Sequence, residues 1–244
     1  MNLILIEPRE VAADGRVRLD DLRAAHLRVV LRAQPGQRMR AGLLNGPRGT
    51  ATVEAVDADG VTLQCAWAGE TPERPRVDLL LALPRPKVLR RLWAQLAALG
   101  VGRILLTNAD RVERVYFDTH VLRPDIYRPL LIEGLQQAQD TRLPEVSIHK
   151  QLKILVEDQL DRLFPDSLRL VADPAARPPP AAAVPADFTG RLLLAVGPEG
   201  GWTAYELDLL ARHGFRPVGL GPRTLRSDTA CLALLTLVHA ALGG

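Results

Sequence analysis

The chain has 244 residues, of which 47% are hydrophobic and 24% charged, so its composition is globular rather than disordered. Domains usually hold about 100–200 residues, and this length therefore allows one large domain or two smaller ones. The net charge of +3 is less than a protein that coats nucleic acid by charge alone would carry. Only three of the 31 basic residues are lysine, which leaves 28 arginines, and we attribute most of this excess to compositional bias.

Several classes of protein are disfavoured by simple features. The two cysteines, Cys65 and Cys231, are too few for a zinc site, and both lie in apolar runs, which predicts buried free thiols in a reducing compartment. The N-terminus lacks the basic segment of a signal peptide, and the longest apolar stretch, 231–242, is too short to cross a bilayer. The five histidines lack metal-ligand spacing. We therefore expect a cytoplasmic protein with no metal and no membrane partner.

Residues 1 to about 70 predict a small β-rich unit. Leu3–Ile6 is expected to form a strand, and apolar residues at helical spacing predict a helix over 22–30, capped by Asp20. Glycine-containing turns then separate three further expected strands, over 38–45, 51–56 and 61–67. This pattern is typical of a hairpin-built barrel or half-barrel. Nine arginines balance nine acids over residues 1–70, so this unit is neutral.

The segment 70–76 contains two prolines and no other apolar residue, and it is the best candidate for a linker. After it, apolar strands alternate with helices, which predicts an α/β sheet with largely parallel strands. Strands are expected over 77–83, 103–107, 146–148, 168–172, 191–196 and 216–220. Helices are expected over 86–99, 124–139, 152–163 and 203–213, and from 227 onward. The proline-rich stretch 173–187 predicts a surface loop.

The strand ending at Val196 leads directly into a glycine-rich segment, Gly197-Pro198-Glu199-Gly200-Gly201. A capping box of Thr203 and Glu206 then opens a helix. The glycine-rich loop therefore joins the carboxyl end of a buried strand to a helix N-terminus, where open α/β sheets bind ligands. Glycines also allow the backbone to come close to a ligand.

A second loop repeats this arrangement near the C-terminus. The strand ending at Leu220 leads into Gly221-Pro222-Arg223-Thr224-Leu225-Arg226, and Ser227 or Asp228 is a good N-cap for the last helix. Two glycine-containing loops with acids and arginines at strand ends form a candidate site. The chain has no P-loop, no Gly-x-Gly-x-x-Gly and no Gly-x-Ser-x-Gly, which argues against common nucleotide, dinucleotide and hydrolase sites.

Purely structural interpretations of these loops remain open. The first loop is then a tight strand-to-helix turn, and Glu199 and Asp228 only complement helix N-termini, a contribution of about 0.3–1 kcal/mol each. Arg223 and Arg226 are, on this interpretation, solvated surface residues.

The two loop motifs, in this order and spacing, resemble the bacterial 16S ribosomal RNA uridine-N3 methyltransferase family, part of the SPOUT superfamily of knotted methyltransferases. The resemblance extends to His26-Leu27, Val30-Leu31-Arg32, Gly36 and Gly46 in the first domain and to Leu99-Gly100-Val101 in the second. It therefore covers nearly the whole chain.

The resemblance implies a PUA-like RNA-binding barrel over 1–71 and a SPOUT α/β methyltransferase domain over 72–244, threaded into a deep trefoil knot. It also implies S-adenosylmethionine as methyl donor without a metal, a homodimer with the active site at the subunit interface, and 16S rRNA of the 30S subunit as partner. The cofactor would be held by three knot loops, through Val171, Ala172, Val196, Gly197, Gly200, Gly201, Leu220, Gly221 and Leu225.

For the reaction, we hypothesise that Arg226 places positive charge beside the negative charge that develops on the uracil carbonyls. Asp228 or Glu199 would orient the base or accept the N3 proton. Arg223 is the candidate for holding a phosphate. These roles are hypotheses drawn from the residue types and the resemblance together.

Residues 71–150 hold 13 basic and 9 acidic residues, an excess of +4 that predicts an RNA-binding surface. Its candidates are Lys87, Arg90 and Arg91 on one expected helix, and Arg32 is a further candidate in the first domain. The alternative is an ordinary solvated helix face.

The chain departs from the family pattern in three places. At 136–140 the family usually has Glu-Gln-x-x-Arg, and here Asp140 replaces the arginine, with Arg142 close by to relieve it. The segment 84–87 also differs, and Ser227-Asp228 stands where Thr-Glu is common. Two alternatives therefore stay open: a SPOUT methyltransferase for another RNA position or atom, and a non-catalytic RNA-binding or assembly protein with the same fold.

Overall fold

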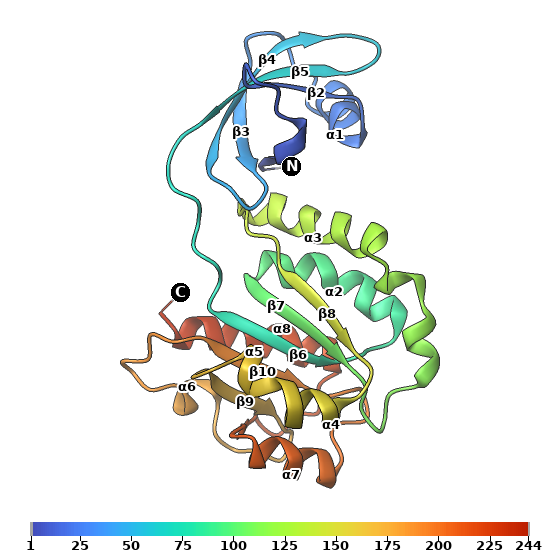
Figure 1. The fold of residues 1–244 in the computed structure, drawn as a ribbon, viewed down its shortest axis with the longest axis vertical. Coiled ribbons are helices and arrows are strands. Elements are labelled where there is room, and N and C mark those ends of the chain that lie inside the picture. Colours follow the sequence, from blue (N-terminus) through green and yellow to red (C-terminus); the bar gives the residue numbers. More distant parts are fainter. Residues whose placement is uncertain (1, 244) are drawn as a thin grey trace. The chain divides into compact units, whose positions relative to one another are not determined.

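The computed structural model describes residues 2–243, and the chain folds into two compact units (Figure 1). The smaller unit contains the residues up to Arg74 and also Ile132–Leu143. The larger unit contains Pro75–Leu131 and the residues from Pro144 onward. The chain therefore leaves the smaller unit and later returns to it, and the sequence pattern does not predict this return.

The smaller unit is built on a curled five-stranded sheet. Its strands are β1 (Ile4–Ile6), β2 (Arg16–Leu19), β3 (Arg38–Leu43), β4 (Arg48–Val56) and β5 (Val61–Trp67), in the order β1-β3-β4-β5-β2. Only β1 pairs in parallel, with β3, and the other pairs are antiparallel. A register shift between Val53 and Ala55 marks a bulge, which bends β4 and strengthens the twist of the sheet.

Short helical segments complete this unit: a 3-10 turn at Pro8–Glu10, helix α1 (Leu22–Ala25) and a π-helical turn at His26–Val30. Asp21, not the expected Asp20, caps α1, because its carboxylate accepts a 2.8 Å hydrogen bond from the N–H of Arg23. The core is formed by the inward side of the sheet and by Leu27, which is fully buried.

The second entry of the chain is bonded firmly into the smaller unit. Thr141 is fully buried, and its hydroxyl donates to the carbonyl of Gly46 at 2.6 Å. Asp140 accepts hydrogen bonds from the backbone N–H groups of Thr141 and Arg142, and its carboxylate lies 3.9 Å from Arg48. The backbone N–H of Arg142 therefore compensates the carboxylate of Asp140, as expected for a neighbour of this acid. The guanidinium of Arg142 donates to the carbonyl of Pro72 instead.

The larger unit contains a six-stranded sheet in which every pair is parallel, which confirms the predicted α/β class. Its strands are β6 (Val77–Ala82), β7 (Val101–Thr107), β8 (Glu145–His149), β9 (Leu168–Ala172), β10 (Leu192–Val196) and β11 (Arg216–Val218), in the order β11-β9-β10-β6-β7-β8. The two central strands, β6 and β10, are buried along their whole length, which explains their continuous apolar runs.

The helices are α2 (Pro86–Ala98), α3 (Pro124–Ala138), α4 (Leu152–Ile154), α5 (Leu160–Leu163), α6 (Pro180–Ala183), α7 (Ala204–Arg212) and α8 (Ser227–Ala241). A π-helical turn at Leu155–Gln159 joins α4 to α5, and 3-10 turns lie at Arg114–Asp118 and His120–Leu122. Helices α2 and α8 lie side by side on one face of the sheet (Figure 1). In the strand order, the connection β6-α2-β7 moves toward β8, whereas the connection β10-α7-β11 moves toward the opposite edge of the sheet. Because crossovers between parallel strands are right-handed, α7 lies on the face opposite to α2.

One ion pair interrupts the apolar interior of the sheet. Asp78 on β6 has no exposed surface, and Arg191 donates to both of its carboxylate oxygens, at 2.7 and 3.0 Å. Burial raises the pKa of Asp78, although the neighbouring guanidinium acts in the opposite direction. The pair ties the start of β6 to the segment just before β10.

The start of α8 differs from the sequence prediction. Arg226 occupies the N-cap, without a side-chain hydrogen bond to the helix, and Ser227 and Asp228 are already helical. The expected N-cap at Ser227 or Asp228 is therefore wrong. Within residues 2–243, no helix combines the length and the apolar character needed to cross a membrane.

Candidate functional site

All six strands of the larger sheet are parallel, so their carboxyl ends lie along one edge, and the loops after β6, β7, β9, β10 and β11 meet there. From β6, the chain adds β7 and β8 on one side of the sheet, whereas β9, β10 and β11 lie on the other side. The strand order therefore reverses between β6 and β10. Ligands of open α/β sheets bind at such a reversal, and the glycine-rich loop follows β10 at this point.

The glycine-rich loop is held from several directions. Its own turn is closed by the N–H of Gly201, which donates to the carbonyl of Pro198 at 2.8 Å. The backbone N–H of Arg85, in the loop after β6, donates to Oε1 of Glu199 at 3.3 Å. From the loop after β7, the guanidinium of Arg111 donates to the carbonyl of Gly200. Loops from three strands thus meet at this one segment.

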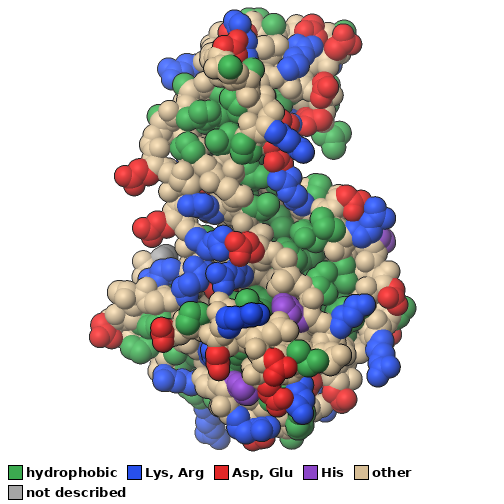
Figure 2. Space-filling model, viewed as in Figure 1, with side chains coloured by type: hydrophobic (Ala, Val, Ile, Leu, Met, Phe, Trp, Pro, Cys, Tyr) green, Lys and Arg blue, Asp and Glu red, His purple; other side chains and the backbone are tan. Residues whose placement is uncertain are grey.

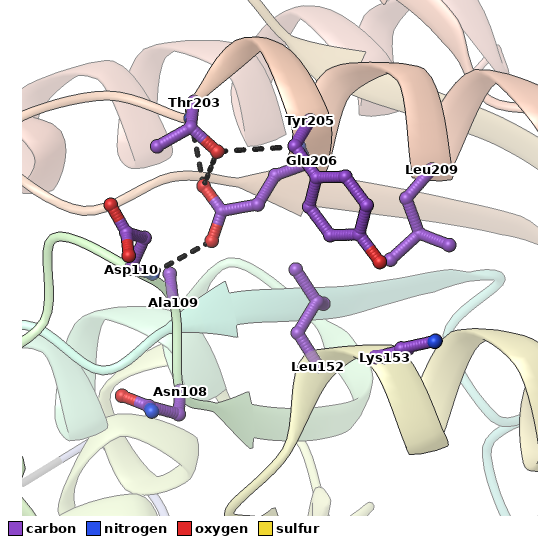
Figure 3. A pocket seen from close by; sticks show the side chains of 9 residues that line it. All are labelled: Asn108, Ala109, Asp110, Leu152, Lys153, Thr203, Tyr205, Glu206 and Leu209. Carbon is purple, nitrogen blue, oxygen red and sulfur yellow. Dashed lines mark hydrogen bonds between the residues drawn. The ribbon is translucent and has the colours of Figure 1, made fainter.

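The predicted capping box opens α7. The N–H of Thr203 donates to Oε2 of Glu206 at 2.7 Å, and the N–H of Glu206 donates back to the Thr203 hydroxyl at 3.3 Å. A third donor, the backbone N–H of Asp110, reaches Oε1 of Glu206 at 2.7 Å (Figure 3). Glu206 is only 5% exposed, so its buried charge is compensated by these N–H groups and the dipole of α7.

A pocket opens beside this capping box, between the loop after β7, α4 and α7 (Figure 3). It is lined by Asn108, Ala109, Asp110, Leu152, Lys153, Thr203, Tyr205, Glu206 and Leu209. None of the residues predicted for the site lines this pocket, and Glu206 is the only carboxylate in it that is buried. The pocket therefore lies next to the glycine-rich loop without including the predicted cofactor residues.

A second pocket lies between the loops after β9 and β11. It is lined by Ala172, Asp173, Pro174, Val218, Gly219, Leu220, Gly221, Arg223, Leu225, Ala230 and Leu234. Four predicted cofactor residues, Ala172, Leu220, Gly221 and Leu225, line it, and so does Arg223. The remaining predicted cofactor residues are not among its walls: Val171, Val196, Gly197, Gly200 and Gly201. Asp173, the last residue of the knot loop 171–173 that the resemblance implies, also lines this pocket. Gly219 and Leu234 line it as well, and no sequence pattern singled them out.

The walls of the second pocket are mostly apolar, with side chains such as Val218 and Leu234 beside the backbone of two loops. Two charged residues, Asp173 and Arg223, also line it. The two loops are in close contact, because a Cβ at Gly219 would lie only 2.1 Å from the carbonyl oxygen of Ala176. Within residues 2–243, no group of three His, Cys, Asp or Glu side chains could hold a metal ion.

The three predicted catalytic residues lie on this edge but do not form one cluster. The side chain of Arg226 is exposed and makes no hydrogen bond or ion pair with the described residues. Asp228 accepts from Nη2 of Arg91 at 3.3 Å, and its other oxygen accepts from the N–H of Thr229. Glu199 is exposed and bonds to the backbone just before α2. Glu199 thus contacts the N-cap residue of α2, Arg85, whereas Asp228 contacts Arg91 in the second turn of that helix.

The predicted RNA-binding residues are all exposed. Lys87 and Arg90 lie on α2, and Arg91 remains 63% exposed in spite of its ion pair with Asp228. Arg32 follows the π-helical turn of the smaller unit. On the face drawn in Figure 2, positive and negative side chains are both present, and several positive ones gather across the middle of the view.

The fold is shared with solved methyltransferases. A putative methyltransferase from Legionella pneumophila, in complex with the cofactor SAM, matches with a TM-score of 0.78 and 24% identity over 98% of this chain and 97% of that one. A ribosomal RNA small subunit methyltransferase E from Neisseria gonorrhoeae, bound to S-adenosyl methionine, matches with a TM-score of 0.77 and 21% identity, again over 98% and 97%. These likenesses show a common mixed α/β fold.

The sequence itself gives the family. Residues 71–239 match the RNA methyltransferase domain family. The ribosomal RNA small subunit methyltransferase E of Treponema pallidum is 31% identical over 250 residues, covering 98% of this chain and 91% of the relative. Its counterpart E 1 in Borreliella burgdorferi is 26% identical, covering 96% and 95%. The resemblance carried by the two glycine loops is thereby confirmed: the chain belongs to the ribosomal RNA small subunit methyltransferase E family and is an RNA methyltransferase.

Proposed function

We propose that this chain transfers the methyl group of S-adenosylmethionine to N3 of a uridine in 16S ribosomal RNA. The observation that carries the proposal is the apolar, backbone-walled pocket between the loops after β9 and β11, in a chain of this family. The names of the relatives support the small-subunit ribosomal RNA as substrate, and the two cofactor-bound structures support S-adenosylmethionine. Such an enzyme would act during ribosome biogenesis in the cytoplasm.

The cofactor would be held mainly by the second pocket. Backbone groups of Ala172, Leu220 and Gly221 would bond the adenosyl part, and Leu225 would cover its base. The rest of the proposed cofactor set, Val171, Val196, Gly197, Gly200 and Gly201, lies on the two adjacent strands and their loop. When bound, S-adenosylmethionine supplies an electrophilic methyl group, so no metal is needed for the transfer.

The protein must then prepare the uracil, whose N3 carries a proton. Arg226 would stabilise the negative charge on the uracil carbonyls as that proton leaves, since its guanidinium has no partner among the described residues. Glu199 or Asp228 would accept the proton. Asp228 already holds an ion pair with Arg91, and Glu199 accepts from the backbone N–H of Arg85, so both acids stay candidates for this role. Arg223 lines the second pocket and would bind a phosphate.

The finer architecture is part of the same proposal. We assign residues 1–71 to a PUA-like RNA-binding domain and 72–244 to a SPOUT domain with a deep trefoil knot. A homodimer is supported by an apolar groove between α2 and α8, which is lined by Gln95, Ala98, Leu99, Thr229, Leu232, Ala233 and Thr236. The half-exposed Leu237 on α8 adds to the apolar surface of this unit.

The experiment is a methylation assay with purified protein, isotopically labelled S-adenosylmethionine and 30S subunits from a strain that lacks this methylation. Digestion of the rRNA and mass spectrometry of the nucleosides should give 3-methyluridine. Another methylated nucleoside would show a SPOUT enzyme for a different position or atom. Calorimetry that detects no S-adenosylmethionine binding would instead indicate a non-catalytic RNA-binding or assembly protein.

The RNA surface on α2 has its own test. Replacing Lys87 and Arg90 together by alanine should weaken RNA binding and reduce the slope of log K against log salt by about 1.4–1.8, as each lost phosphate contact contributes about 0.7–0.9. Filter binding between 50 and 200 mM salt measures the slope. The matched control is Arg162→Ala with Arg212→Ala, two arginines on α5 and α7. If both double variants show the same salt dependence of RNA binding, the exposed face of α2 is an ordinary solvated surface.

A further inference from the structure

Two hydrogen bonds join the segment after β7 to the loop and helix after β10. The backbone N–H of Asp110 donates to Glu206 at 2.7 Å, a contact visible in Figure 3. The guanidinium of the next residue, Arg111, donates to the carbonyl of Gly200. The proposed reaction gives neither Asp110 nor Arg111 a role. Adjacent residues of one segment therefore contact both the glycine-rich loop and the helix that it opens.

The side chain of Arg111 also lies directly on Gly200. A Cβ at Gly200 would be 2.9 Å from Cδ of Arg111 and 3.3 Å from its Cβ, closer than real Cβ atoms normally come. Gly200 does not have a positive φ, so its backbone conformation is open to other residues. The stem of Arg111, and not a positive φ, therefore limits the space for a side chain at position 200.

This contact fixes one peptide of the loop. The carbonyl of Gly200 and the N–H of Gly201 belong to the same planar peptide unit. Arg111 bonds to the carbonyl, and the N–H donates to Pro198 at 2.8 Å, so both ends of this peptide are held. Glycines lose more conformational entropy than other residues when a loop becomes ordered, and an external contact offsets part of that loss.

We propose that Arg111 is a positioning residue of the methyl transfer site, which holds the glycine-rich loop in the conformation that binds the cofactor. Arg111 does not line the second pocket, so it acts through Gly200 and not by touching the cofactor there. The inference rests on the proposed function, because it requires the loop 197–201 to contact S-adenosylmethionine. Losing Arg111 then weakens cofactor binding much more than it slows the chemical step.

The first test compares single variants in the methylation assay. Arg111→Ala should raise the KM and the Kd for S-adenosylmethionine about 10-fold, because a hydrogen bond from a charged donor is lost. Its kcat and thermal unfolding should stay close to the wild type. Arg111→Lys, which keeps a charged donor on a long stem, should restore part of the affinity. Arg114→Ala, which removes an exposed side chain three residues away that makes no hydrogen bond or ion pair with the described residues, should change neither constant.

Two results would overturn the proposal. One is an unchanged KM for S-adenosylmethionine in Arg111→Ala. The other is a loss of RNA affinity alone, which would mean that Arg111 binds RNA directly. If the wild type itself binds no S-adenosylmethionine, the proposed function and this inference fail together. If the wild type binds the cofactor and the Arg111→Ala variant binds it equally well, only this inference is contradicted.

A double-mutant cycle adds a readout that a general loss of stability does not mimic. Gly200→Ala should raise the KM in the presence of Arg111, because the new methyl group displaces the arginine stem. In the Arg111→Ala background Cγ and Cδ are gone and only the Cβ of residue 111, at 3.3 Å, remains beside the new methyl group, so the double variant should be little worse than Arg111→Ala alone. Additive effects of the two substitutions would mean that Arg111 and Gly200 act independently, contrary to the proposal.

Discussion

The loops after β10 and β11 look alike in sequence, since each follows a parallel strand and leads into a helix. Their surroundings are different. The first loop is bonded to residues after β6 and β7, and its helix starts with a complete capping box. In the second loop every residue from Gly221 to Arg226 is exposed, and α8 starts without a side-chain cap. One loop is preformed, and the other has few contacts that would hold it.

The difference suggests a division of labour within one site. A preformed loop binds without a further loss of entropy, whereas a loop with few contacts belongs to the least stable part of a fold and is ordered by its ligand. The second loop carries Arg223 and Arg226, whose side chains make no hydrogen bond or ion pair with the described residues. The groups that we propose to contact the RNA therefore lie on the more adaptable loop.

The largest expected effect comes from the second loop. Arg226→Ala should lower kcat by about 100- to 1,000-fold, as for removal of a group that stabilises developing negative charge. Since Arg226 has no partner among the described residues, S-adenosylmethionine affinity and stability should be unchanged. Arg223→Ala, the matched control on the same loop, should affect the KM for RNA more than kcat. If the Arg226→Ala variant keeps a near-normal kcat, Arg226 has no catalytic role.

The first loop should instead respond in stability. Glu206→Ala leaves the N–H groups of Asp110 and Thr203 without their acceptor, and should reduce the free energy of unfolding by about 2–4 kcal/mol. Urea denaturation measures this change. Asp208→Ala on the same helix removes only an exposed ion pair with Arg212 and should cost less than about 0.5 kcal/mol. Similar losses for the two variants would contradict the preformed character of the first loop.

The smallest effect is a change in thiol reactivity. Cys231 lies in the first turns of α8, and burial raises the pKa of its thiol to about 12, while that of Cys65 is raised to about 11. At pH 8, therefore, the Cys231 thiol stays protonated in the closed state, and alkylation requires local opening. S-adenosylmethionine should slow alkylation of Cys231 severalfold and leave Cys65 unaffected, as followed by mass spectrometry. Equal rates at Cys231 with and without cofactor would argue that the second loop is already ordered.

Elements with a local signal were predicted well. The apolar run of β6, the helical spacing of α2 and the capping box of α7 each depend on residues a few positions apart, and the structure contains all three. Strand β2 was missed, because Arg16–Leu19 has only two apolar residues in alternation. At α8 local propensity was misleading: Ser227 is buried and Arg91 engages Asp228, so both are used inside the helix rather than at its cap.

The sequence by itself determined the fold class, the family and the two loops, because periodicity, capping and motif spacing are short-range properties. Only the tertiary structure decided which partners those loops have. Arg85 meets Glu199 across 114 positions, Arg91 meets Asp228 across 137, and Arg111 meets Gly200 across 89. These contacts follow from the strand order, which places β10 beside β6 and β6 beside β7. No local pattern specifies that order, since it results from how whole strands and helices pack together.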